Sequence, residues 1–148
     1  MAEHASHVVC PHCLAVNRLP AERPALMAKC GSCHRQLCTG KPFDASTAEL
    51  DRHIARNDIP VAVDCWAEWC GPCRVMGPAF ERAASELEPH VRLLKVDVDK
   101  EAAVGQRYAI RSIPLLLLLV GGKLVAQQAG AMNTPGIVGW VRSHTPLG

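Results

Sequence analysis

Aromatic side chains and long apolar runs are scarce in this chain of 148 residues, and its positive and negative charges nearly balance. Only six residues are aromatic and the formal net charge is +2. The sequence therefore offers neither the basic surface nor the stacking platform that nucleic-acid binding uses. The longest apolar run, residues 113–120, is far too short to cross a bilayer. We expect no nucleic-acid partner and no insertion into a membrane.

A secretory signal is also missing from the start of the sequence, because residues 1–13 hold no basic segment followed by a long apolar stretch. A cytoplasmic location is the resulting expectation. Structural disulfides are rare in that compartment, so paired cysteines there usually bind metal or carry out redox chemistry. Cysteine is abundant in this chain: six of the eight residues form three Cys-x-x-Cys pairs.

Composition divides the chain into two parts. Residues 1–40 hold five of the eight cysteines, four basic and two acidic side chains, and few of the large aliphatic residues that a core requires. Residues 41–148 carry the apolar runs, and their charges balance at twelve of each sign. We predict a small module over 1–40, which needs a metal or a cross-link to fold, followed by a larger domain over 41–148.

The larger domain alternates between helical and strand-like patterns. Apolar periodicity and turn residues predict, in order, a helix over 44–58 capped by Asp or Ser, a strand over 60–67, a helix over 71–87, a strand over 91–99, a short helix over 101–110, a hairpin over 113–130 around Gly121 and Gly122, and a helix over about 134–144. This order favours an α/β fold with a central mixed sheet and helices on both faces.

Cys10, Cys13, Cys30 and Cys33 have the spacing of a tetrahedral zinc site, C-x₂-C-x₁₆-C-x₂-C. In a segment without a core of its own, metal binding also supplies the folding energy, on the order of 10–16 kcal/mol for structural zinc. One Zn²⁺ held by four thiolates would carry a charge of −2 and cancel the positive excess of the module. His12, His34 and Cys38 are less favoured as ligands, because the four positions are already filled.

The pair Cys70 and Cys73 follows a predicted buried strand and opens a predicted helix. Unsatisfied N–H groups at a helix N-terminus favour a thiolate, so Cys70 is the expected nucleophile. Cys73, one turn further on, is expected to be shielded and to close a disulfide with it. Pro72 fits the first turn without losing a hydrogen bond, and Gly71 is expected to allow a tight backbone. The expected reaction is attack by Cys70 on a disulfide, formation of a mixed disulfide, and its resolution by Cys73.

The segments "VDCWAEWCGPCR", "LLKVDVD", "IRSIP" and "VGGKLV", together with "QAGA", occur in order and resemble the thioredoxin family. With a cysteine module ahead of them, the chain resembles the zinc-binding thioredoxin-2 subfamily in particular. The resemblance implies a thioredoxin fold preceded by a zinc-ribbon-like module. It also implies a monomeric protein-disulfide reductase without a bound organic cofactor, which reduces client proteins and is recycled by an NADPH-dependent thioredoxin reductase.

Further roles follow from the resemblance alone. Asp64 corresponds to a buried carboxylate that shuttles the proton of Cys73, with Lys95 beside it, and burial is expected to raise the pKa of Asp64. Trp69 corresponds to the residue that shapes the rim around Cys70, and Trp66 to one that packs below it.

The substrate groove is implied in the same way. Pro114 matches the cis-proline of the family, Ile113 would offer its backbone to an extended substrate, and the loop at Gly130 would lie opposite. Four residues depart from the family pattern. Glu68 and Gly77 flank the site at positions that are more often Pro or Ala. Leu115 stands where Thr is usual, which makes the floor of the groove more apolar, and Cys65 replaces a usual Phe as a small buried residue.

A second function remains open from the sequence. In that alternative the chain is a redox-responsive chaperone or binding module, whose zinc site releases its metal on oxidation and then holds a client. The discriminating observation is whether zinc stays bound while Cys70 and Cys73 cycle.

Overall fold

The computed structural model describes residues 6–20 and 25–145. The outermost residues of both predicted domains, 1–5 and 146–148, lie outside this part of the chain, as do residues 21–24. The elements in chain order are β1 (Ser6–Val9), β2 (Val16–Leu19), the 3₁₀ helix η1 (Ala25–Met27), β3 (Phe43–Asp44), α1 (Thr47–Arg56), β4 (Val61–Trp66), α2 (Gly71–Leu87), β5 (Arg92–Asp97), α3 (Ala102–Arg107), β6 (Leu115–Val120), β7 (Lys123–Ala129) and α4 (Thr134–Ser143).

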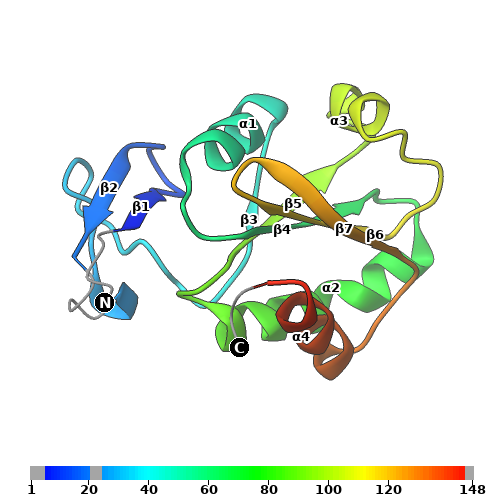
Figure 1. Cartoon of the computed structure of the whole chain (residues 1–148). Helices are drawn as coiled ribbons and strands as arrows, with labels where there is room; N and C mark the ends of the chain where they lie inside the picture. Colours follow the sequence, from blue (N-terminus) through cyan, green and yellow to red (C-terminus); the bar gives the residue numbers. More distant parts are fainter. Residues whose placement is uncertain (1–5, 21–24, 146–148) are drawn as a thin grey trace.

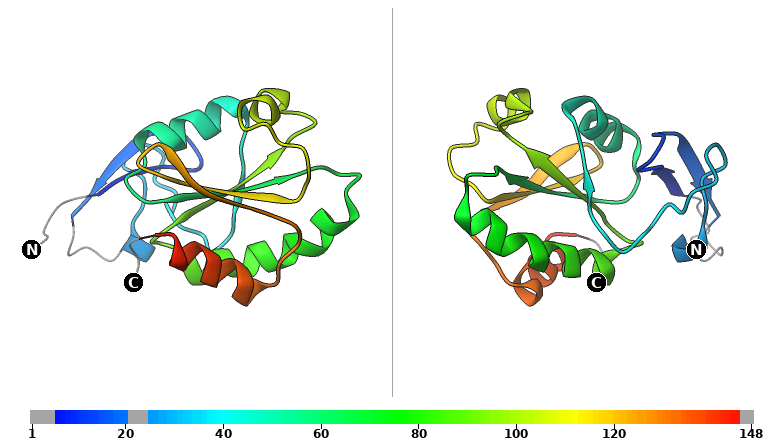
Figure 2. Two further views of the ribbon diagram at one scale, coloured as in Figure 1. Left: turned by 45° about the vertical axis from the view of Figure 1, so that its right-hand side comes forward. Right: turned by 180° about the vertical axis from the view of Figure 1, so that it is seen from behind.

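A mixed sheet organises residues 43–143, as the sequence predicts, but it has five strands where the sequence predicts four. Its strand order is β3-β5-β4-β6-β7; β4 is parallel to β5 and antiparallel to β6. Helices α1 and α3 cover one face, and α2 and α4 cover the other (Figures 1 and 2). This is a thioredoxin fold, in which the three inner strands β5, β4 and β6 are buried from both sides.

The two faces of the sheet bury separate cores because successive strand residues point in opposite directions. Leu93 and Leu116 face α2 and α4, where they pack with Phe80. Their neighbours Leu94 and Leu117 pack in the opposite core, beneath α1 and α3. This double burial explains why these strands read as continuous apolar runs in the sequence.

Some predicted boundaries hold and others need correction. Helix α3 ends at Arg107 and not at residue 110, and β5 ends at Asp97 and not at residue 99. Helix α2 has the predicted bounds. The first helix begins three residues later than predicted, because Ser46 is its N-cap and forms a capping box with Glu49. Asp44 belongs instead to the short strand β3, which pairs with β5. Gly121 and Gly122 have φ angles of 59° and 83°, which a two-residue hairpin turn requires.

The cysteine-rich module holds more regular structure than the sequence indicates. Strands β1 and β2 form an antiparallel pair, and a small core contains Leu37, Ala28 and two of the paired cysteines, Cys10 and Cys30. The prediction that this segment has no core was therefore wrong. Since cysteines make up half of the buried set, the core still depends on what holds their sulfur atoms together.

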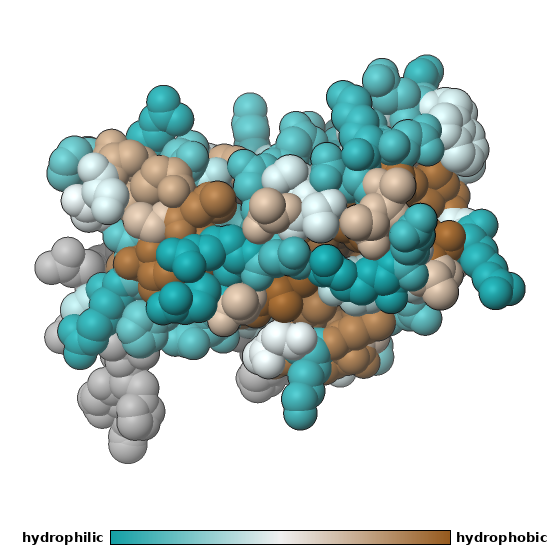
Figure 3. All heavy atoms as spheres, turned by 90° about the horizontal axis from the view of Figure 1, so that it is seen from above, coloured by the Kyte–Doolittle hydropathy of each residue, from teal (hydrophilic) through white to brown (hydrophobic). Residues whose placement is uncertain are grey.

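The surface over α1 and α3 is mostly hydrophilic. Figure 3 looks down on this face and shows hydrophobic side chains mainly in the gaps between polar ones. Among the described residues, no helix is long and apolar enough to span a membrane.

Candidate active site and metal centre

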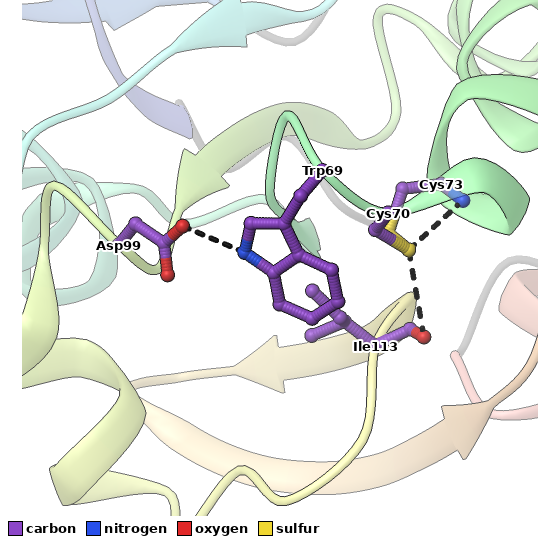
Figure 4. Close-up of a disulfide and its surroundings, with 5 residues drawn as sticks. All are labelled: Trp69, Cys70, Cys73, Asp99 and Ile113. Atoms are coloured by element: carbon purple, nitrogen blue, oxygen red, sulfur yellow. Dashed lines mark hydrogen bonds between the residues drawn. A yellow bond between two sulfur atoms is a disulfide. The ribbon is translucent and has the colours of Figure 1, made fainter.

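Cys70 and Cys73 form a disulfide at the start of α2, shortly after the end of β4. Cys70 is the N-cap of α2, and the two Cα atoms are 5.2 Å apart. The backbone N–H of Cys73 donates a hydrogen bond of 3.2 Å to Sγ of Cys70 (Figure 4). One N–H donor and the positive end of the helix dipole thus converge on one sulfur, which favours its thiolate once the disulfide is reduced.

The surroundings of the pair match the sequence expectations only in part. Pro72 lies in the first turn of α2, where its missing N–H costs nothing. Cys73 is 3 % exposed, as expected, but Cys70 is also 3 % exposed. A Cβ built on Gly71 would meet nothing within 4 Å. The expectation that Gly71 admits a tight backbone was therefore wrong, since the space beside it is open.

Trp69 forms a rim next to the disulfide. Its side chain is 71 % exposed, yet Nε1 donates a hydrogen bond of 2.8 Å to Oδ2 of Asp99 (Figure 4). A groove of about 340 Å³ starts at this indole and is lined by Trp69, Val98, Ile110, Arg111, Ser112 and Ile113. An exposed aromatic ring beside an apolar groove is a typical surface for contact with another protein.

The loop before β6 contributes Ile113 to this groove and lies next to Cys70. The Ile113–Pro114 peptide bond is cis, which confirms the sequence expectation. Sγ of Cys70 lies 3.7 Å from the carbonyl oxygen of Ile113. Gly130, with a φ of 97°, donates its N–H to the carbonyl oxygen of Pro114 at 2.9 Å. The structure thus brings these predicted groove residues together around the disulfide.

Two of the residues that depart from the family pattern lie side by side behind this loop. Leu115 and Cys65 are register partners on β6 and β4, and they are 8 % and 0 % exposed. Both belong to the core beneath α1 and α3. Burial raises the pKa of Cys65 to about 12, so this thiol stays protonated at neutral pH.

Asp64 is a buried carboxyl group on the central strand β4. It is 1 % exposed, and among the described residues neither of its oxygens has a hydrogen-bond partner. Burial raises its pKa from 3.8 to about 7, and the nearby positive charge of Lys95 opposes that rise. Lys95 is the register partner of Asp64 on β5, and its Nζ lies 4.8 Å from the ring centroid of Trp66. A carboxyl group with this pKa can both accept and release a proton at physiological pH.

Asp99 is absent from the set of site residues predicted from the sequence. Its hydrogen bond to Trp69 joins positions thirty residues apart, and no local spacing signals such a pair. The motif around "VDVD" predicts a strand and its end but assigns no partner to the second aspartate. The contact depends on the tertiary structure, which brings the loop after β5 beside Trp69.

The four paired cysteines of the module meet in one cluster. Their Sγ atoms all lie within 4.8 Å of one another. Sγ of Cys10 lies 3.6 Å from that of Cys33, and Sγ of Cys13 lies 3.6 Å from that of Cys30. Thiolates bound tetrahedrally to one Zn²⁺ at about 2.3 Å would be roughly 3.8 Å apart, so the four residues fit the ion.

The backbone around the cluster supports the charge that zinc ligands carry. N–H groups of His12 and Ser32 each donate a hydrogen bond of 3.3 Å to the sulfur of Cys10 and Cys30, respectively. Burial raises the pKa of Cys10 to about 12, whereas hydrogen bonding from the backbone of Cys33 lowers the pKa of Cys30 to about 6. A metal ion displaces both protons, because only thiolates ligate zinc.

The less favoured ligands lie outside the cluster, which contains neither histidine nor Cys38. The ring of His12 instead contacts the carbonyl oxygen of Gln36 and the edge of Phe43. A turn, and not a helix, follows Cys10. The pair of Cys10 and Cys13 therefore lacks a helix N-terminus like the one that favours the thiolate of Cys70.

Comparisons with known proteins agree with the geometry. The model of the thioredoxin family matches residues 41–143, and the model described as "Thioredoxin 2, N-terminal" matches residues 9–35. The protein "Thioredoxin C-3" of Corynebacterium nephridii is 36 % identical over 134 residues, which cover 90 % of this chain and 92 % of that one. "Thioredoxin 2" of Chlorobaculum tepidum is 39 % identical over 94 residues, 64 % of this chain and 86 % of the other.

A solved structure shows the same fold. A mutant thioredoxin from Halobacterium salinarum superposes with a TM-score of 0.67 at 29 % identity, covering 75 % of this chain and 96 % of that one. Together with the disulfide at a helix N-terminus and the cysteine cluster, these matches identify a thiol-disulfide oxidoreductase that carries a structural zinc site. The chain belongs to the thioredoxin family.

Proposed function

We propose that Cys70 is the nucleophile and Cys73 the resolving thiol in the reduction of protein disulfides. The thiolate of Cys70 attacks one sulfur of the client disulfide, forms a mixed disulfide and releases the other client sulfur as a thiolate, which takes up a proton. Cys73 then attacks Sγ of Cys70 and releases the second client thiolate. Two electrons pass to the client, and the chain is left with the Cys70–Cys73 disulfide.

The observation that carries this assignment is the position of Cys70 as the N-cap of α2, with the N–H of Cys73 donating to its sulfur. Both features stabilise negative charge on Cys70 and not on Cys73. The thiol with the larger thiolate fraction attacks first at neutral pH.

Asp64 is proposed to take the proton of Cys73 before the resolving step. Its pKa of about 7 suits a group that must be ionised to accept this proton and protonated to return it. Lys95 is proposed as a positioning residue, because its positive charge opposes the effect of burial and keeps that pKa near neutrality.

Client binding is assigned to the groove beside the disulfide. An extended client segment would hydrogen-bond to the backbone of Ile113 next to Pro114, and Gly130 would flank it from the opposite side. Trp69 would bury its exposed ring against the client. The open space beside Gly71 and the rigid ring of Pro72 would let a bulky protein disulfide approach Cys70 closely.

Thioredoxin reductase and disulfide-containing clients are the partner kinds that the family implies. We propose further that the chain acts as a monomer in the cytoplasm and divides into domains at residues 40 and 41. One chain supplies every residue of the site, and a reducing compartment suits its six free cysteines. No contact among the described residues specifically favours the alternative function of a redox-responsive chaperone.

The direct test couples insulin reduction to NADPH oxidation through a thioredoxin reductase. Wild-type protein should support turnover, and Cys70→Ser should abolish it. A reductase that is active on another thioredoxin but gives no turnover with this chain would refute the proposal.

A further inference from the structure

Arg92, a cation, is the largest fully buried side chain of the described residues. It is 0 % exposed and begins strand β5. Its Nη1 donates a hydrogen bond of 3.1 Å to Oε2 of Glu88, the C-cap of α2, whose side chain is 1 % exposed. A buried ion pair is costly to desolvate and needs further hydrogen bonds to be tolerated. The proposed reaction uses neither residue, so the partners of this pair call for their own explanation.

The further hydrogen-bond partners of this side chain, among the described residues, both come from the cysteine-rich module. Nη2 of Arg92 donates to the carbonyl oxygen of Val9 at 3.2 Å and to that of Leu37 at 2.8 Å. Val9 directly precedes the first cysteine pair, and Leu37 follows the second. The free oxygen of Glu88, Oε1, accepts the N–H of Gly40 at 2.7 Å. One guanidinium group therefore binds both halves of the module at once.

Val9 is held from a second direction as well. Its N–H donates a hydrogen bond of 2.8 Å to Oδ1 of Asn57, which is 6 % exposed. Nδ2 of Asn57 is in turn 2.8 Å from Nδ1 of His53, a buried residue of α1. Both backbone groups of the residue before Cys10 are thus fixed by the thioredoxin domain.

We propose that Arg92 couples zinc binding in the module to the stability of the thioredoxin domain. Zinc draws the two cysteine pairs together, and the same closure places the carbonyl groups of Val9 and Leu37 where one guanidinium can reach both. When the metal leaves and the two halves of the module separate, Arg92 loses these two acceptors, and those of its charged N–H groups that stay buried beside Glu88 are left without hydrogen bonds. The coupling is reciprocal, so Arg92 also raises the affinity for zinc.

The charges agree with this coupling. Four thiolates around one Zn²⁺ carry a net charge of −2 close to the guanidinium. Burial lowers the pKa of Arg92, whereas Cys38, Glu88 and Cys10 raise it when they are ionised. Arg92 thus compensates charge on Glu88 and on the metal site together.

The test compares Arg92→Lys with Arg107→Lys in the full-length, reduced protein. Lysine keeps the positive charge beside Glu88, but its single ammonium group cannot form the fork that binds two carbonyl groups. Arg107 pairs with Asp51 on the surface and serves as the matched control. In competition with a chromogenic zinc chelator, Arg92→Lys should bind zinc about tenfold more weakly or worse, and Arg107→Lys should match the wild type. A zinc affinity within twofold of the wild type for a folded Arg92→Lys protein would overturn the proposal.

Hydrogen exchange on the wild type gives a second, independent test that requires no substitution. The N–H of Arg92 donates to the carbonyl oxygen of Pro60 within the thioredoxin domain, at 2.8 Å. Removal of zinc by the chelator should accelerate exchange of this amide by about tenfold or more. Unchanged exchange at Arg92 after complete removal of zinc would refute the coupling, even if Arg92→Lys fails to fold.

Discussion

The indole of Trp69 is 71 % exposed, yet its Nε1 donates a 2.8 Å hydrogen bond to Asp99, which fixes the ring beside the groove. Without this bond the ring would be free to change rotamer, and ordering it against a client would cost entropy. The contact therefore prepares the rim for binding before a client arrives.

Asp99→Ala should lower kcat/KM for insulin reduction by about fivefold, which corresponds to about 1 kcal/mol, the net contribution of a typical hydrogen bond at an exposed site. The loss should appear mainly as a higher KM, because the bond orders a binding surface and leaves the sulfur chemistry intact. Asp51→Ala, which removes another exposed aspartate, is the control. Equal kinetics for the two variants would contradict this role of Asp99.

Cys73→Ser should halt the reaction after the first step. Cys70 keeps its helix N-terminus and attacks the client, but no thiol remains to resolve the mixed disulfide. Mass spectrometry of the mixture with a client should show a covalent adduct at Cys70 that dithiothreitol releases. An adduct at Cys38 or Cys65, or none at all, would argue against the assigned order of attack.

Asp64 should make the oxidised protein less stable as the pH rises. Below about pH 4 the folded and unfolded states both hold the proton; between pH 4 and pH 7 only the folded state does, because its pKa is raised from 3.8 to about 7. The free energy of unfolding should therefore fall across this range, by on the order of 4 kcal/mol. Asp64→Asn should remove this part of the slope in urea unfolding measured from pH 4 to pH 8.

The exposed residue Asp44 gives the control, since Asp44→Asn should keep the wild-type slope. Only the slope is diagnostic, because a buried asparagine also changes the absolute stability. Parallel pH profiles for the wild type and Asp64→Asn would show that Asp64 ionises in the folded state as it does in the unfolded chain.

Zinc binding should depend on the clustered cysteines and not on the buried thiol beside them. Metal analysis should find one zinc per chain in the wild type and in Cys38→Ser, and far less in Cys30→Ser. Cys38 is buried and lies outside the cluster, so it tests whether the loss is specific to a ligand. Loss of zinc from Cys38→Ser as well would require a different ligand set.

Much of the fold could be predicted because the local signals agree with the tertiary structure. Helix α2 carries an N-terminal proline and a regular apolar face, and its bounds were predictable. The strands of the central sheet are buried on both faces, which makes them continuous apolar runs. The short strand β3 has no such pattern, because only its pairing with β5 makes Phe43 and Asp44 a strand.

Residues of the site also divide into those with a local sequence signal and those that only the tertiary structure brings together. Cys70, Cys73 and the four clustered cysteines stand in spacings that chemistry imposes, so the sequence alone points to them. Arg92 and Glu88 carry no such signal, since an arginine at the start of a strand normally faces water. Both residues are buried because the cysteine-rich module packs against them, and the sequence does not show this contact. Asp99 was hidden for the same reason, because its partner lies far away in the sequence.

Helix α2 carries Cys70 at its first end and Glu88, against the cysteine-rich module, at its last. Its 17 residues separate these two ends by about 26 Å, and Figure 1 shows the module and the start of α2 at opposite ends of the molecule. An electrode or bead that holds the protein by its cysteine-rich end should therefore leave the opposite end free to exchange electrons with molecules in solution.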